Sequence, residues 1–158
     1  MKKLNLRHAA FFALAAVSTV FVSCGDDDGG DPIGPGNGNK NYKYTLTVDE
    51  PIDETDFISF VIVGASGTQQ ETMWKVNNTP RTGEQGISLG RNEFKGGTHT
   101  YVVESVQPLR MASLGVQLIN FDMDLKYAFK IEVNGEVKVN ESGTLKGDGS
   151  DFTRDYNF

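Results

Sequence analysis

The chain has 158 residues, of which 38% are hydrophobic, 10% aromatic and 23% charged, a composition typical of a globular protein. Fifteen basic and 21 acidic residues give a net charge of −6, which argues against nucleic-acid binding because that role needs a basic surface. The single cysteine excludes an intrachain disulfide framework.

The N-terminus has the pattern of a secretory signal peptide. A basic stretch, residues 2–7, precedes an apolar run over residues 9–22, which is too short to be a typical membrane-spanning helix. The run ends in Phe21-Val22-Ser23-Cys24, which resembles the lipobox of bacterial lipoproteins. The resemblance implies that residues 1–23 are removed and that Cys24 carries acyl chains such as palmitate, which anchor the protein in a membrane. The alternative is an ordinary cleavage site beside an unmodified cysteine.

An acidic stretch follows the cysteine. Asp26, Asp27 and Asp28 resemble the export signal of surface-exposed lipoproteins in Bacteroidota, which implies display on the outer face of the outer membrane. The alternative is a solvated acidic linker, which leaves open whether the domain faces the outside or the periplasm. Residues 24–41 are predicted to form a flexible tether, because Gly, Pro, Asn and Asp dominate them.

Residues 42–158 are predicted to form one all-β domain. The clearest strands alternate between polar and apolar residues, as strands with one buried face do; they span residues 42–48, 125–133 and 152–158. Weaker strands are expected over residues 69–76, 87–89, 98–106 and 116–123. The pair Asn134-Gly135 predicts a two-residue hairpin turn. Residues 77–80 are expected to break a strand, and residues 109–114 to form one helical turn.

The segment from Phe57 to Val63 is almost continuously apolar, which predicts a central strand covered on both faces. Seven to nine closely spaced strands favour an antiparallel β-sandwich. The segment Glu132–Val137, followed by Gly143-Thr144, resembles the last hairpin of immunoglobulin-like domains on bacterial surfaces. This resemblance implies an immunoglobulin-like sandwich.

The domain offers little catalytic chemistry. Once the signal peptide is removed, His99 is its only histidine, and acylation of Cys24 leaves no thiol. No nucleophile-elbow, Walker or zinc-ligand spacing occurs. We therefore predict no catalytic residue, no metal site and no cofactor.

Clustered carboxylates are the remaining candidates. Asp122, Asp124 and Asp151 are the residues on which a small envelope hydrolase would depend. Asp148, Asp151 and Asp155 offer oxygens to calcium, although an Asp/Gly turn before the last strand is the preferred interpretation.

Two groups of apolar residues suggest surfaces for binding. Trp74, Phe94 and Tyr101 suit either a sugar-binding platform or the core of a sheet, and the core is preferred. The loop Gln107–Met111 carries residue types that are common in interfaces, although capping one end of the sandwich is the preferred role.

Together these features predict an outer-membrane lipoprotein whose domain is a non-catalytic binding module. Its partner is expected to be a glycan, a host protein or an envelope complex, with no role for nucleic acid. The alternatives are the small hydrolase and a periplasm-facing accessory subunit whose edge strand pairs with a neighbour.

Overall fold

The computed structural model describes residues 38–158 except residues 50, 70–71, 96 and 98. The signal peptide, Cys24 and the three aspartates Asp26, Asp27 and Asp28 therefore lie outside the described residues. The described part contains ten strands and one short helix, in the order β1 (Tyr42–Val48), β2 (Phe57–Ala65), β3 (Thr72–Val76), β4 (Thr79–Thr82), β5 (Gly86–Gly90), α1 (Arg91–Phe94), β6 (Thr100–Ser105), β7 (Met111–Asn120), β8 (Leu125–Val133), β9 (Glu136–Leu145) and β10 (Ser150–Asn157).

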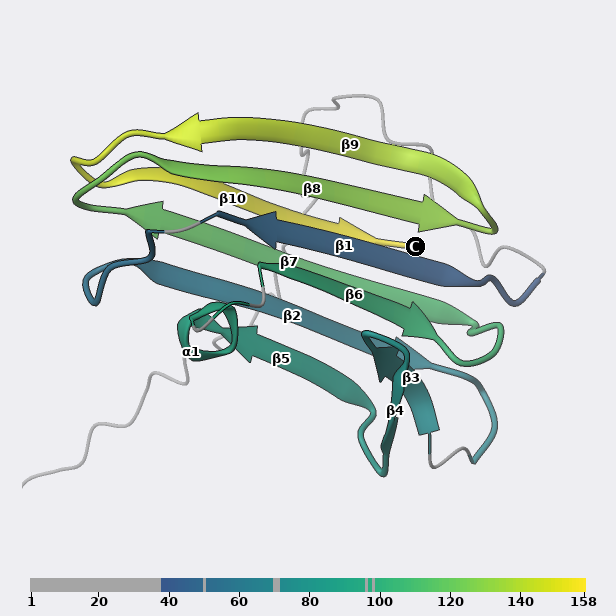
Figure 1. Cartoon of the computed structure of the whole chain (residues 1–158). Coiled ribbons are helices and arrows are strands. Elements are labelled where there is room, and N and C mark those ends of the chain that lie inside the picture. The colour runs from purple at the N-terminus through teal and green to yellow at the C-terminus, as the bar shows by residue number, and fades with distance from the viewer. Residues whose placement is uncertain (1–37, 50, 70–71, 96, 98) are drawn as a thin grey trace, which may run out of the picture. The chain divides into compact units, whose positions relative to one another are not determined.

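The strands form two antiparallel sheets (Figure 1). One has six strands in the order β4-β3-β6-β1-β8-β9, and the other has four in the order β10-β7-β2-β5. The prediction of an all-β domain with antiparallel sheets is confirmed. The predicted hairpin is confirmed too, since Asn134 and Gly135 join β8 to β9 with φ of 52° and 80°.

One local prediction was confirmed in part and one was wrong. Strand β3 ends at Val76 as expected, but only Asn77 and Asn78 form the turn, with φ of 47° and 66°; Thr79 and Pro80 begin β4, which raises the number of described strands to ten. No helical turn occurs at residues 109–114, because Leu109 pairs with Lys40 and β7 begins at Met111.

The core lies between the two sheets. Tyr42, Tyr44, Leu46 and Val48 all point into it from β1 and are at most 2% exposed. Phe60 of the four-stranded sheet meets Phe129 of the six-stranded sheet edge to face, with ring centres 6.4 Å apart. Alternation along each strand therefore places one apolar row per strand in a shared interior.

Strand β2 corrects the expectation for the most apolar segment. It is central in its sheet, between β7 and β5, as predicted. Only its inner face is covered, where Ile58, Phe60 and Ile62 are at most 3% exposed. Phe57, Val61 and Val63 lie on the opposite face, where each is at least 38% exposed.

Candidate functional site

The outer face of the four-stranded sheet carries a row of exposed apolar side chains. On β2, Phe57, Val61 and Val63 are 46%, 38% and 50% exposed, and Met111 at the start of β7 is 58% exposed. We call these four residues the β2–β7 face. Soluble domains normally keep such side chains scattered, so an aligned group on one sheet is a candidate interaction surface.

Small residues on the neighbouring strands leave these side chains uncovered. Val61 stands opposite Gly115 of β7 and Ser88 of β5, and Val63 stands opposite Ser113 and Gly86. None of these partners is large enough to cover a valine from the side.

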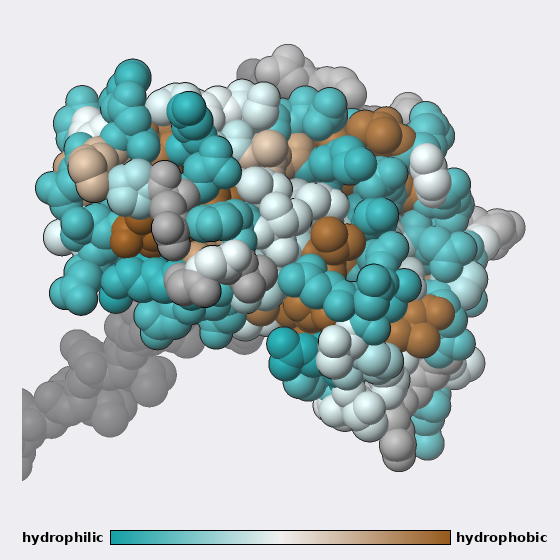
Figure 2. All heavy atoms as spheres, viewed as in Figure 1, coloured by the Kyte–Doolittle hydropathy of each residue, from teal (hydrophilic) through white to brown (hydrophobic). Residues whose placement is uncertain are grey.

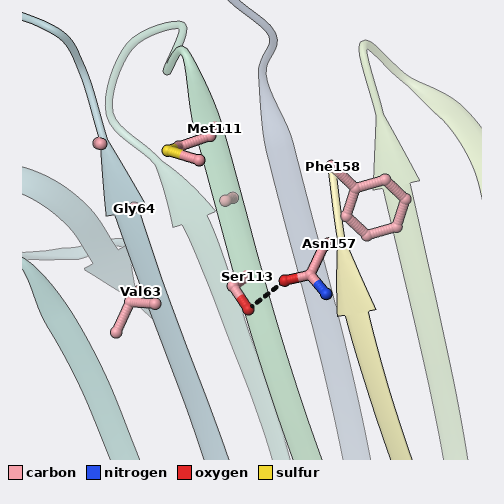
Figure 3. A pocket seen from close by; sticks show the side chains of 8 residues that line it. Val63, Gly64, Met111, Ser113, Asn157 and Phe158 are labelled. Atoms are coloured by element: carbon pink, nitrogen blue, oxygen red, sulfur yellow. Dashed lines mark hydrogen bonds between the residues drawn. The ribbon is translucent and has the colours of Figure 1, made fainter. Parts of the chain in front are cut away.

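One end of the β2–β7 face is hollowed (Figure 3). The concavity has a volume of about 270 Å³ and is mainly apolar. Its lining comes from β2, β7 and the end of the chain, namely Val63, Gly64, Ala65, Met111, Ala112, Ser113, Asn157 and Phe158. Its main polar feature is the hydrogen bond from Ser113 Oγ to Asn157 Oδ1, at 2.7 Å.

Close packing holds the floor of the concavity in place. A Cβ atom on Gly64 would lie 2.7 Å from the Trp74 ring and 2.8 Å from Leu109 Cδ1, so only glycine fits there. The backbone of Phe158 exchanges hydrogen bonds with Ala112 on β7, at 2.9 and 3.2 Å. The site is therefore built on paired strands and is preformed.

The outer face of the six-stranded sheet is polar by contrast. Glu104 of β6 forms ion pairs with Lys75 of β3, at 3.0 Å, and Lys43 of β1, at 3.7 Å. Lys130 and Glu132 pair along β8 at 3.1 Å. On the side of the molecule seen in Figure 2, hydrophobic residues form small separate patches within a largely hydrophilic surface. The two sheets thus differ in the chemistry that they expose.

The carboxylates named by the sequence analysis have separate partners. Asp122 Oδ2 accepts a hydrogen bond from Thr55 at 2.6 Å, and Asp124 pairs with Lys146. Asp151 Oδ2 accepts from Thr153 at 2.9 Å. The described residues contain no group of three His, Cys, Asp or Glu side chains arranged to hold a metal ion.

The Asp/Gly segment before β10 is a turn, as preferred from the sequence. Asp148 and Gly149 have φ of 109° and 85°, and their N–H groups bond to Phe121 and Asn120. Gly147 lies so close to Asp122 that a Cβ there would be 1.8 Å from the Asp122 carbonyl oxygen. The segment therefore serves to dock the β9–β10 turn on the β7–β8 loop.

The most buried carboxylate at this end belongs to Asp56, which sequence reasoning missed. It is 5% exposed and accepts hydrogen bonds from the N–H groups of Asp53, at 2.7 Å, and Phe121, at 3.2 Å. It ties the β1–β2 loop to the β7–β8 loop. Its position just before an apolar strand resembles that of many solvated turn residues, so the sequence carried no signal for it.

The aromatic candidates are core residues, as preferred. Trp74 and Phe94 are fully buried, and Tyr101 packs edge to face on Phe94 with ring centres 4.8 Å apart. Trp74 donates its indole N–H to the carbonyl of Gln85 at 3.0 Å.

His99 has a structural role, since its carbonyl accepts a hydrogen bond from the Val48 N–H. In the loop Gln107–Met111, Leu109 is fully buried in the core, whereas Met111 lines the concavity on the outer face.

A polar cluster closes the side of the molecule between β9 and β10. Glu141 accepts a hydrogen bond from the Tyr156 hydroxyl at 3.0 Å and pairs with Arg154 at 3.4 Å. Arg154 in turn stacks over the Phe152 ring, 4.8 Å from its centre. Burial and the bond to Glu141 raise the pKa of Tyr156 to about 12.

Comparisons with known proteins show the fold alone. No family model and no curated protein matches the chain. A solved structure of the calcium-bound form of a protein from Parabacteroides distasonis has a TM-score of 0.56 and 17% identity, and the match covers 80% of this chain and 99% of that one. A DUF4425 family protein from Bacteroides ovatus ATCC 8483 has a TM-score of 0.55 and 10% identity, with 77% and 95% covered.

Both neighbours come from Bacteroidetes, the group whose surface lipoproteins the segment around Cys24 resembles. Among the described residues, no helix has the length and apolar character needed to cross a membrane.

Proposed function

We propose that this chain is a lipid-anchored, surface-displayed binding module without catalytic activity, and that it binds a protein partner through the β2–β7 face. The observation that carries the proposal is the row of exposed Phe57, Val61, Val63 and Met111 on the outer face of one sheet. Cys24 supplies the acyl anchor in this proposal, and Asp26, Asp27 and Asp28 supply the export signal. The immunoglobulin-like character of the domain also remains a proposal.

The chemistry of the face favours a protein over a glycan. Sugars are usually held by several exposed aromatic rings together with polar groups, whereas Trp74 and Phe94 are buried in the core and Phe57 is the single aromatic residue of the face. Two valines, a methionine and a phenylalanine beside a preformed apolar concavity suit the side chains of a protein.

Neither the hydrolase nor a calcium site gains support from the described residues. Asp122, Asp124 and Asp151 bond to different partners. The related fold from Parabacteroides distasonis was solved in a calcium-bound form. In this chain both oxygens of Asp56 already accept backbone N–H groups, and no described group of three ligands suits a metal ion. The proposal therefore includes no calcium site.

Site-specific photo-crosslinking in living cells tests the binding face. Benzoylphenylalanine replaces Met111 in one strain and Val137 in a matched control strain; Val137 is 50% exposed, on β9. The proposal expects a discrete protein adduct at Met111 that disappears when Val63→Asp is added, and no such adduct at Val137. Absence of an adduct at Met111 and also at Phe57 would contradict it.

Protease treatment of intact cells tests the display. Wild type is compared with a variant in which Asp26, Asp27 and Asp28 are replaced by Ala. The proposal expects the protease to remove the wild-type domain and to spare the variant, with both digested after lysis. If both are protected until lysis, the domain faces the periplasm, and the partner is an envelope component.

A further inference from the structure

We propose that two copies of this chain pair through the free edge of β5, so that the four-stranded sheets of the two copies join in one continuous sheet. This inference goes beyond the proposed function, because it uses the edge of the sheet and not the β2–β7 face. It stands whether or not that face binds a partner.

The hydrogen-bonding phase of β5 leaves a row of backbone groups facing away from β2. The Gly64 N–H bonds to the carbonyl of Gln85, which stands opposite it. In an antiparallel pair every second residue bonds to the partner strand, so Ile87 and Leu89 also bond to β2. The N–H and C=O groups of Gly86, Ser88 and Gly90 therefore point toward the free edge. The Gly90 N–H confirms this direction, since it bonds to the Glu93 carboxylate at 2.8 Å beyond the edge.

Among the described edge strands, β5 is the one whose own residues include no usual protection against pairing. Edge strands are normally blocked by charges, prolines or bulges. Strand β10 carries Asp151, Arg154 and Asp155, β9 carries Glu136 and Lys138 with a register shift, and β4 carries Pro80 and Arg81. Strand β5, Gly-Ile-Ser-Leu-Gly, contains no charge, proline or bulge, and the Glu93 carboxylate covers its edge only at Gly90.

The β5 sequence is self-complementary, which points to a second copy as the occupant. It reads nearly the same in both directions around Ser88, with glycine at each end and a branched aliphatic residue at each inner position. Antiparallel pairing about a two-fold axis at Ser88 places Ser88 opposite Ser88 of the second copy, and Gly86 opposite Gly90. Ile87 falls opposite Leu89 of the second copy, and no like-charged side chains oppose each other along this strand.

This register matches the free backbone groups. The two Ser88 residues exchange both N–H···O=C bonds, and each Gly86 N–H bonds to the Gly90 carbonyl of the other copy.

A cysteine at Ser88 tests the pairing directly. The mature chain from residue 24 with Cys24→Ser has no other thiol. In the proposed pair the two Ser88 Cα atoms are about 5.5 Å apart, which is within the range that a disulfide spans. We expect Ser88→Cys to form a disulfide-linked dimer about tenfold or more faster than the control Thr153→Cys, because an interface holds the two thiols at high effective concentration. Thr153 is an exposed residue of the β10 edge in the same sheet.

Light scattering over a range of protein concentrations provides the second measurement. We expect wild type to associate reversibly into dimers and Ser88→Lys, which places a charge on an exposed edge position, to remain monomeric with an unchanged circular dichroism spectrum. Equal rates of disulfide formation for the two cysteine variants would overturn the proposal. So would a dimer that persists in Ser88→Lys, since its interface would lie elsewhere.

Discussion

Tyr156 closes the side of the core between β9 and β10, with help from Glu141 and Arg154. Tyr156 packs on Phe129 and Phe158 with ring centres 5.8 and 6.3 Å away, while its hydroxyl reaches Glu141. Burial is the largest cause of its raised pKa, followed by the hydrogen bond and charge of Glu141, and Arg154 opposes them. The folded state therefore favours the neutral phenol.

This arrangement predicts a specific pH dependence of stability. The pKa of Tyr156 rises from 10.0 to about 12 on folding, so the folded protein holds this proton more tightly than the unfolded chain. The resulting stabilisation is complete below about pH 10 and is lost as the pH rises toward 12. We expect the free energy of unfolding to fall more steeply above pH 10 in wild type than in Tyr156→Phe, as measured by urea unfolding at several pH values. The other tyrosines are present in both proteins, so parallel curves would contradict the assignment to Tyr156.

At the scale of elements, alternation in the sequence located most strands because one face of each is buried. Strands β1, β8 and β10 follow the predicted alternation closely, and Asn134-Gly135 was recognised because both positions need positive φ. Strand β4 was missed because Pro80 signals a break, although an edge strand tolerates proline. The exposed face of β2 was missed for a different reason: composition shows that a segment is apolar, but not whether another element packs on it.

The β3–β4 hairpin gives a prediction at this scale. Asn77 and Asn78 both have positive φ, but only Asn77 ties the hairpin to β6, through Val102 N–H at 2.8 Å and the Thr100 carbonyl at 3.2 Å. We expect Asn77→Gly to lower the free energy of unfolding by about 1–3 kcal/mol, from two lost hydrogen bonds. Asn78→Gly keeps the turn and is expected to change it by less than about 0.5 kcal/mol. Urea unfolding of both variants checks this, and equal losses would contradict the role given to Asn77.

At the scale of the whole molecule, the two sheets share one core and expose opposite kinds of surface. Ion pairs cover the outer face of the six-stranded sheet, whereas the four-stranded sheet exposes the β2–β7 face. The candidate site could not be located from the sequence, because it arises where strands far apart in the chain meet without a covering layer. Met111 was the one residue of the concavity that the sequence had named as a candidate interface residue, within the loop Gln107–Met111.

A pair of adjacent residues on β2 tests this two-sided arrangement. Ile62 is fully buried and Val61 is 38% exposed on the other face. We expect Ile62→Ala to lower the free energy of unfolding by about 2–5 kcal/mol through lost burial and a cavity. Val61→Ala is expected to cost about 1 kcal/mol or less, because little packs on it. A loss of similar size for Val61→Ala in guanidinium unfolding would mean that the outer face is covered.

The point at which the chain enters the domain has a mechanical consequence. Lys40 and Leu109 exchange hydrogen bonds at 2.8 Å, and the next residues lead into β1, which is bonded along its length to β6 on one side and β8 on the other. A pull on the N-terminal side acts along β1, perpendicular to its inter-strand hydrogen bonds, and loads many of them at once in shear. An edge strand pulled from its end would unzip one bond at a time. With the lipid anchor proposed at Cys24, drag on the domain would therefore act through a strand that is hydrogen-bonded on both sides.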